Sequence, residues 1–261
     1  MAGDTTSTLP PSAAAKPNYD RDARQNTHVK NGMEIPAPKN NAALAQAFIL
    51  GGSPCSGKST LAERLADTWG WQYYKVDDYQ EDHARRCERQ TLYSARTLYS
   101  ARRPVMHRYA SMTWNEIWMR PVEQQVAEEF AYYRERFELI LEDLESFDLD
   151  RPLLLEGCAF LPELLAQSSA DPRRVLFLVP TQAFQRHHYR QRPWIQHILN
   201  ECADPEQAFE NWMLRDALFG QEILRQAQAE DYATLLVDGS QTLAEITTHV
   251  KACFESACTH A

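Results

Sequence analysis

The chain has 261 residues, of which 24% are charged and 44% hydrophobic, and its formal net charge is −9. This length fits one α/β domain with insertions, or two small domains, and is ample for a hydrophobic core. The acidic balance argues against a general nucleic-acid-binding protein, and no apolar run approaches the length of a membrane span. Six cysteines without a Cys-x-x-Cys pair or zinc-ligand spacing, and a start unlike a signal peptide, predict reduced thiols and a cytoplasmic protein. Nothing in the sequence distinguishes a monomer from a homodimer.

Residues 1–44 differ in composition from the rest of the chain. They are rich in Thr, Ser, Pro, Ala and Asn and show no apolar periodicity, so they bury too little surface to offset the entropy of ordering. We therefore expect a disordered N-terminal leader at 1–44, followed by one folded domain over residues 45–261.

Residues 48–60 predict a phosphate-binding loop. An apolar strand over residues 47–50 leads into the P-loop (Walker A) spacing, in which four residues separate Gly52 from Gly57. An apolar stripe then predicts a helix, whose N-terminus directs the positive end of its dipole into the loop. The residues expected to bind a nucleoside triphosphate are Gly52, Ser53, Cys55, Ser56, Gly57, Lys58, Ser59 and Thr60.

Within this loop the residue types indicate separate roles. Lys58 is expected to reach the β- and γ-phosphates as a point charge, and the Ser59 hydroxyl to bind Mg²⁺. Cys55 lies where a helix dipole lowers a thiol pKa, but we expect it to be a spacer rather than a redox group. A glycine-rich turn that binds no ligand is the alternative interpretation of the motif.

A second strand is predicted over residues 71–76, and it delivers two aspartates to the same sheet edge. Asp77, Asp78 and Tyr79 follow the strand directly. In a doubly wound parallel sheet, ligands bind at the carboxyl ends of the strands. Asp77 is therefore expected to orient an acceptor hydroxyl and take its proton, with Asp78 as the alternative base. Capping of the next helix is the competing role for both.

Residues 79–150 predict a helical cap inserted between the second and third strands. Its first part contains many arginines and a tandem copy over residues 91–102, which we interpret as a local duplication. Most of these arginines are expected on a solvated helix face, with an anionic-substrate surface as the alternative. The arginines are Arg85, Arg86, Arg89, Arg96, Arg102, Arg103 and Arg108, and Arg120 is a further candidate for substrate binding.

A long helix is predicted after Pro121, with an apolar stripe that extends to Leu144. Trp114 and Trp118, which precede it, are expected in an aromatic core rather than as a stacking platform. The other face of the long helix is acidic and is expected to be solvated. The acidic residues are Glu123, Glu128, Glu129, Glu135, Glu138 and Glu142.

The third strand is predicted over residues 152–157 and ends in a carboxylate. Glu156 follows a continuous apolar run and precedes Gly157. This arrangement is similar to a Walker B strand, whose acid holds Mg²⁺ directly or through water. The sequence therefore predicts a metal site formed by Ser59, Asp77 and Glu156, with Glu156 also near the substrate.

A fourth strand over residues 174–180 is followed by an arginine-bearing lid at 181–203. Thr181 is expected to cap a helix that carries Arg186, Arg190 and Arg192. A guanidinium that closes over ATP stabilises charge on the transferring group, so Arg186 and Arg190 are candidate catalytic residues and Arg192 a candidate ATP contact.

Two further elements complete the predicted domain. A capping box at residues 204–207 starts a helix that is expected to reach about Ala229, and Gly220 marks a candidate break. The fifth strand covers residues 233–239, and its Asp238-Gly239 turn is a candidate adenine-binding site.

Taken in order, these motifs resemble those of the P-loop small-molecule kinases, a group that includes uridine, nicotinamide riboside, gluconate and shikimate kinases. The resemblance covers about 45 to 80 and 150 to 255, and the cap matches no member. It implies a three-layer α/β/α P-loop NTPase fold with a five-stranded parallel sheet of order 2-3-1-4-5. It also implies ATP and Mg²⁺ as cofactors and a small-molecule hydroxyl as acceptor. By position, Asp77 is the implied base and Glu156 the implied metal- or substrate-orienting acid.

Two other functions stay open from the sequence. A nucleoside-monophosphate kinase phosphorylates a phosphate, so it needs an arginine clamp and no general base, and Arg120 is compatible with that role. A non-catalytic ATP-binding module would bind nucleotide without turnover.

Overall fold

The computed structural model describes residues 41–93 and 103–258, and its centre is a five-stranded parallel sheet. The strands are β1 (Phe48–Gly52), β2 (Gln72–Lys75), β3 (Leu153–Glu156), β4 (Val175–Pro180) and β5 (Ala233–Val237). Their order is β2-β3-β1-β4-β5, and every neighbouring pair is parallel. The predicted fold class and strand order are therefore confirmed.

The register of the sheet brings the predicted site residues to one edge. Leu50 and Lys75 both lie opposite Glu156, and Gly52 lies opposite Leu178. Because the strands are parallel, the P-loop, the Asp77 turn and the end of β3 all follow carboxyl ends at the same edge.

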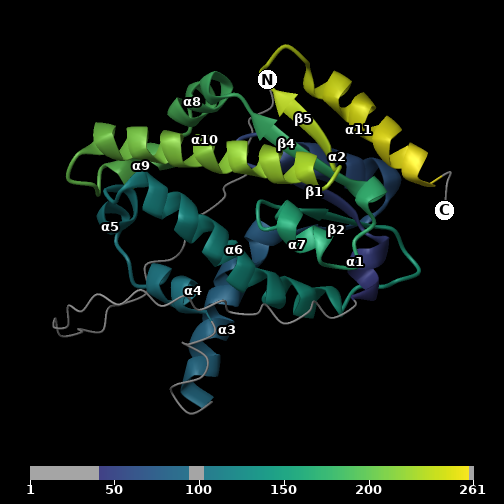
Figure 1. Cartoon of the computed structure of the whole chain (residues 1–261), viewed down its shortest axis with the longest axis horizontal. Coiled ribbons are helices and arrows are strands. Elements are labelled where there is room, and N and C mark those ends of the chain that lie inside the picture. The colour runs from purple at the N-terminus through teal and green to yellow at the C-terminus, as the bar shows by residue number, and fades with distance from the viewer. Residues whose placement is uncertain (1–40, 94–102, 259–261) are drawn as a thin grey trace.

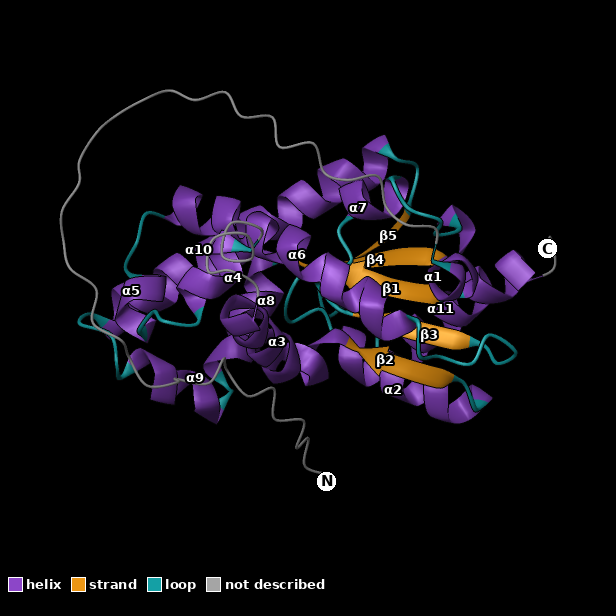
Figure 2. Cartoon of the chain, turned by 90° about the horizontal axis from the view of Figure 1, so that it is seen from below, coloured by secondary structure: helices purple, strands orange, loops and turns teal. Residues whose placement is uncertain are grey.

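Helices cover both faces of the sheet, so the domain has three layers (Figures 1 and 2). One face packs against α1 (Ala42–Gln46), α6 (Val122–Leu144), α7 (Pro162–Ala166) and α10 (Pro205–Ala229). The other face packs against α2 (Lys58–Trp69) and α11 (Leu243–Cys258). The central strand β1 is buried along its whole length, as both covered faces require.

The predicted cap consists of α3 (Gln80–Tyr93), α4 (Pro104–Tyr109), α5 (Trp114–Trp118) and α6. In Figure 2 these helices gather at one end of the sheet together with α8 (Gln182–Arg190) and α9 (Pro193–Leu199). All four cap helices lie between β2 and β3 in the chain, and α6 also contributes to the core of the domain. Phe130, Phe137 and Ile140 of α6 pack in the same core cluster as Ile49 and Leu155, so α6 belongs to one layer of the domain.

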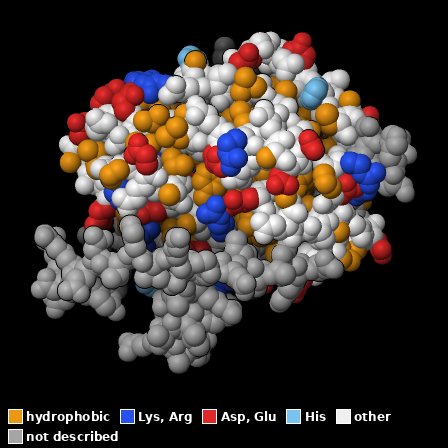
Figure 3. Space-filling view, in the orientation of Figure 1, with side chains coloured by type: hydrophobic (Ala, Val, Ile, Leu, Met, Phe, Trp, Pro, Cys, Tyr) orange, Lys and Arg blue, Asp and Glu red, His pale blue; other side chains and the backbone are white. Residues whose placement is uncertain are grey.

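The expectation that the cap's charges face solvent is correct for several of the described ones, such as Arg85, Glu123 and Glu138, and wrong for Arg103 and Glu128, which are buried. Glu128 of α6 binds both Arg108 and Arg120, Glu138 binds Arg103 at 2.8 Å, and Glu142 binds Arg86 at 2.6 Å. The acidic face of α6 and the arginines of the preceding segments therefore neutralise each other. On the molecular face of Figure 3, acidic and basic side chains are likewise interspersed. The tandem copy at 91–102 lies outside the residues whose side chains are described.

Two predicted boundaries differ from the structure. Ala43 and Leu44 of α1 are buried in the core and Asn41 caps this helix, so the predicted leader boundary at residue 44 is wrong by a few residues. The predicted break at Gly220 is also wrong, because α10 continues through it. Within the described part of the chain, no helix is both long and apolar enough to cross a bilayer.

Gly220 is required by packing rather than by backbone conformation. A Cβ atom at this position would lie 2.9 Å from Val179 Cγ1 and 3.0 Å from Ser53 Oγ. The absent side chain lets α10 approach both β4 and the P-loop.

We predict that Gly220→Val lowers the free energy of unfolding by about 1–3 kcal/mol, because a larger side chain overpacks this contact. Gln221→Val is the matched control, since it places the same side chain at a neighbouring, exposed position of the same helix. Urea unfolding of both variants measures the difference, and equal stabilities would contradict a close packing role for Gly220.

Candidate active site

The loop after β1 is fixed by a close contact with β4. The Ser53 N–H donates to the Leu178 carbonyl at 3.1 Å, and Gly52 has a φ of +124°. A Cβ atom at Gly52 would lie 1.9 Å from the same carbonyl oxygen, so only glycine fits. Gly57, also at positive φ, caps α2, which begins at Lys58. The chain therefore forms the strand, loop and helix that a phosphate-binding loop requires.

The Lys58 ammonium is buried inside this loop. Its Nζ donates to the Ser53 carbonyl at 2.7 Å and to Ser56 Oγ at 3.3 Å, and it lies 3.5 Å from Cys158 Sγ. Burial opposes the charge, but Cys158, Glu156 and Asp77 together raise the pKa of Lys58 above its usual value. Lys58 is therefore cationic, and it lies where it would contact a bound phosphate.

Glu156 lies beside this lysine and is almost fully buried, at 2% exposed. Burial, with a smaller contribution from Asp77, raises its pKa to about 7 against the opposing effects of Lys58, a Ser59 hydrogen bond and Lys75. The Tyr73 hydroxyl also donates to Glu156 Oε2 at 3.3 Å. The predicted metal residues Ser59 and Glu156 are thus in contact.

Asp77 and Asp78 are the exposed residues of a 3₁₀ turn, Val76–Tyr79. Their charges affect the pKa values of different neighbours. The charge of Asp77 contributes to raising the pKa of Lys58, Glu156 and Cys158. The charge of Asp78 instead contributes to raising the pKa of Tyr73, Lys75 and Tyr79. Asp77 is therefore the aspartate that faces the P-loop. Tyr79 stacks on Tyr74 with ring centroids 4.4 Å apart.

The predicted lid arginines divide into two groups. Arg186 binds Glu210 of α10 through both terminal nitrogens, at 2.8 and 2.5 Å, and Arg190 lies 3.3 Å from Glu206. Arg192 instead reaches the P-loop, where its Nη2 lies 3.5 Å from Cys55 Sγ. In this arrangement Arg192 is the lid residue adjacent to the phosphate-binding loop.

Three other predicted residues have the following positions. Burial raises the pKa of Cys55 despite Arg192, so the lowered pKa considered from the helix dipole is wrong. Arg120 binds Glu128 and donates to the Tyr109 hydroxyl at 3.1 Å. The side chain of Asp238 accepts from Ser240 N and Oγ, and it is exposed in the turn after β5.

Two residues of the site, Cys158 and the tyrosine next to Glu156, were not predicted from the sequence. Burial, with contributions from Asp77 and Glu156, raises the pKa of Cys158 to about 12 even though Lys58 lowers it, so this residue is a thiol. Its place two residues after Glu156 is the one signal that could have indicated a contact with the loop. Tyr73 lies in β2 three residues before Val76, and only the pairing of β2 with β3 brings it to Glu156.

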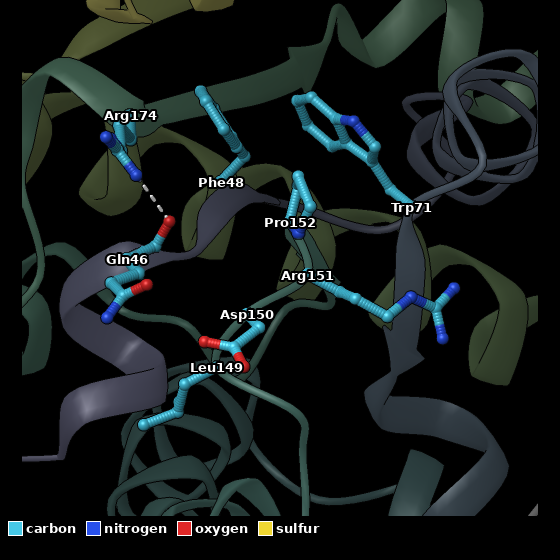
Figure 4. Close-up of a pocket in the computed structure, with 8 residues that line it drawn as sticks. All are labelled: Gln46, Phe48, Trp71, Leu149, Asp150, Arg151, Pro152 and Arg174. Carbon is cyan, nitrogen blue, oxygen red and sulfur yellow. Dashed lines mark hydrogen bonds between the residues drawn. The ribbon is translucent and has the colours of Figure 1, made fainter.

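A hollow at the opposite edge of the sheet is separate from this site (Figure 4). It is lined by residues that precede or begin the strands, namely Gln46, Phe48, Trp71, Leu149, Asp150, Arg151, Pro152 and Arg174. Phe48 and Trp71 stack with centroids 4.6 Å apart, and Arg174 donates to the Gln46 carbonyl at 2.6 Å. These contacts bind the amino ends of the strands together.

Protein side chains alone do not complete a metal site here. Among the described residues no group of three or more His, Cys, Asp or Glu side chains is arranged to hold a metal ion. Ser59, Asp77 and Glu156 instead offer a hydroxyl and two carboxylates, which are oxygen donors of the kind Mg²⁺ prefers. Mg²⁺ commonly uses one or two carboxylates together with substrate phosphates, so this donor set fits Mg²⁺ bound with a nucleotide.

A parallel 2-3-1-4-5 sheet with this loop after its central strand defines a P-loop α/β protein. No family model and no curated protein matches the chain. Among solved structures it is similar to a gluconokinase from Sinorhizobium meliloti 1021, with 16% identity, a TM-score of 0.40, and 83% of this chain and 95% of that chain covered. It is also similar to a shikimate kinase from Aquifex aeolicus vf5, with 16% identity, a TM-score of 0.34, and 82% and 98% covered.

Glu156 gives a pH-dependent prediction. A carboxyl with a raised pKa destabilises the fold progressively as pH rises from its unfolded value near 4.5 through about 7. We therefore expect Glu156→Gln, which cannot ionise, to gain about 2 kcal/mol relative to the native protein between pH 4.5 and pH 8.

Urea unfolding at the two pH values measures this difference. Glu230→Gln, on the surface, is the control and is expected to change stability by less than about 0.5 kcal/mol at both pH values. A difference for Glu156→Gln that does not vary with pH would show that Glu156 ionises normally.

Proposed function

We propose that the protein is an ATP-dependent phosphotransferase whose acceptor is a hydroxyl group of a small molecule. The observation that carries this proposal is the convergence of a buried P-loop lysine, Lys58, with two carboxylates, Asp77 and Glu156, from the ends of two other strands. A phosphate-binding site alone requires only the loop and the lysine, whereas hydroxyl phosphorylation also uses a base and a metal-holding acid.

The loop and the lid provide the contacts for ATP in this proposal. The backbone N–H groups from Cys55 to Ser59 and the Lys58 ammonium bind the phosphates, which replace the Ser53 carbonyl as the acceptor for Nζ. Arg192 adds a second cation above the loop, next to Cys55. Arg186 and Arg190 act on the phosphates only if they leave Glu210 and Glu206, and the Asp238-Gly239 turn is the proposed adenine contact.

Mg²⁺ would be held by Ser59 and Glu156 on the protein side, with Asp77 adjacent. When bound, the ion neutralises charge on the β- and γ-phosphates. Burial disfavours the ionised form of Glu156, and a nearby dication would favour the carboxylate that binds the metal.

Asp77 is the proposed general base. In the transfer the acceptor oxygen forms a bond to the γ-phosphorus, the bond from that phosphorus to the ADP oxygen breaks, and the acceptor proton passes to Asp77. Asp77 is suited to this because it is exposed and its charge contributes to raising the pKa of Lys58. The charge of Asp78 instead contributes to raising the pKa of Tyr73 and Lys75. Asp78, Tyr79 and Arg120 remain candidate substrate contacts.

The alternative of a nucleoside-monophosphate kinase is less well supported. Such an enzyme needs arginines available for the acceptor phosphate. Arg108 and Arg120 share Glu128, and Arg103 binds Glu138, so each of these cap arginines already has a carboxylate partner.

We predict that Lys58→Met and Asp77→Asn each lower the rate of ADP formation by roughly 10²- to 10⁴-fold, since each removes a group used in the transfer. The measurement is acceptor-dependent ADP release with Mg²⁺, ATP and a panel of nucleosides, sugars and amino alcohols. Lys251→Ala, on α11, and Asp67→Asn, at an exposed position of α2, are the matched controls and are expected to retain the rate within about threefold.

Calorimetry separates binding from transfer in the same variants. Lys58→Met is expected to lose Mg·ATP binding, while Asp77→Asn keeps it. Tight binding by the native protein with no turnover on any acceptor would support a non-catalytic module. Activity only on monophosphates would support the alternative kinase class.

A further inference from the structure

Arg136 on α6 is a buried charge that the proposed chemistry does not use. It is only 1% exposed and is one of the largest fully buried side chains. Burying a guanidinium is costly unless its donors are satisfied. Its Nη2 donates to the Val76 carbonyl at 2.5 Å and its Nε donates to His83 Nδ1 at 2.9 Å. Within residues 41–93 and 103–258 it forms no direct ion pair with a carboxylate.

His83 connects this arginine to its countercharge. His83 is fully buried, and its Nε2 lies 2.6 Å from Asp143 Oδ2. Because Nδ1 accepts from Arg136, the imidazole proton must lie on Nε2, from which it is donated to Asp143. Burial, together with Arg136 and Arg86, lowers the pKa of His83 despite its bond to Asp143, so the ring is neutral.

Asp143 is in turn held by two other side chains. The Tyr74 hydroxyl donates to Asp143 Oδ2 at 2.7 Å, and Arg86 binds Oδ1. Tyr74 belongs to β2 and Arg86 to α3, so Asp143 of α6 joins the cap to the sheet. The chain of bonds then runs from Asp143 through His83 and Arg136 to the backbone of Val76.

The far end of this chain is the peptide group that precedes Asp77. The Val76 carbonyl belongs to the peptide bond between Val76 and Asp77. Because this peptide group is planar, the direction of the carbonyl fixes the position of the Asp77 backbone. The side chain of Val76 is also held, because a Cβ atom on Gly157 would lie 2.7 Å from Val76 Cβ. Val76 is thus fixed on one side by the cap and on the other by the residue after Glu156.

We infer that Arg136 is a positioning residue for Asp77, and that neutral His83 keeps Arg136 in the orientation that binds the Val76 carbonyl. The inference rests on the proposed role of Asp77 as the base. It makes the packing of the cap helices α3 and α6 a condition for a correctly placed base, since His83 comes from α3 and Arg136 and Asp143 from α6.

Hydrogen–deuterium exchange tests the positioning without any acceptor. Arg136→Lys keeps the charge but cannot bind Val76 and His83 with the same fork geometry. We expect at least tenfold faster exchange of the amides of residues 77–80 in this variant, with those of residues 52–60 unchanged. Arg134→Lys is the control, because Arg134 lies on the same helix in a partly exposed ion pair with Glu163. Unchanged exchange at 77–80 would overturn the inference.

Turnover with the acceptor found in the panel assay gives the second test. Arg136→Lys is expected to lower kcat by about 10- to 100-fold with the KM for ATP within twofold. In the Asp77→Asn background the same change is expected to have no further effect, because both act through one group. An additive loss would indicate a general structural role.

Loss of transfer in Asp77→Asn without loss in Arg136→Lys refutes the positioning role alone, whereas full activity of Asp77→Asn refutes the proposed base.

A pair of variants at His83 covers the case in which Arg136→Lys does not fold. His83→Asn retains an oxygen that can accept from Arg136, whereas His83→Leu removes the acceptor. We expect slow exchange at 77–80 and most of kcat to survive in His83→Asn and to be lost in His83→Leu. Equal behaviour of the two variants would exclude His83 as the group that orients Arg136.

Discussion

The site depends on the burial of one ammonium group, that of Lys58. A charge in this position is tolerated because the Ser53 carbonyl accepts a hydrogen bond from the ammonium and Glu156 and Asp77 supply opposite charge. Burial is the main cause of the raised pKa of Glu156, and the second carboxylate, Asp77, adds to it. A phosphate group would compete with the carboxylates for the lysine, and a divalent cation would compensate them. Under the proposed function, the metal and the nucleotide would therefore each compensate a different part of the site's charge.

The cap is held together by charge pairs as much as by apolar packing. Glu135 of α6 accepts from the N–H groups of Val105 and Met106 at the start of α4, so it serves as a capping group from another helix. Glu128 binds Arg108 of α4, and Glu138 binds Arg103 just before it. Glu142 binds Arg86 of α3. A single partly buried pair contributes little, but a row of them fixes the register of α4 against α6. This gives the acidic face of α6 a specific structural role.

The sequence was sufficient for the sheet and the loop because their signals are local. Residues 52–60 carry a spaced motif, and each strand is a short apolar run bounded by turn residues, so the order of the strands followed from the resemblance to P-loop kinases. The contacts of Arg136 could not be derived in this way. Arg136 adjoins Phe137 on a helix whose charged residues are numerous, and only the packing of α3 against α6 shows that His83 meets it. Likewise, a glycine in a helical pattern predicts a break, whereas the packing role of Gly220 depends on where β4 and Ser53 lie.

The long helix α10 connects all parts of the candidate site. Near its start Glu210 binds Arg186 of the lid, and Asn211 donates to the Trp118 carbonyl of the cap at 2.8 Å. One turn further, Arg215 binds Glu129 of α6 at 2.5 Å. Beyond it, Gly220 lies against Ser53 of the P-loop. Since these contacts all lie on one continuous helix, α10 fixes the positions of the lid, the cap and the P-loop relative to one another.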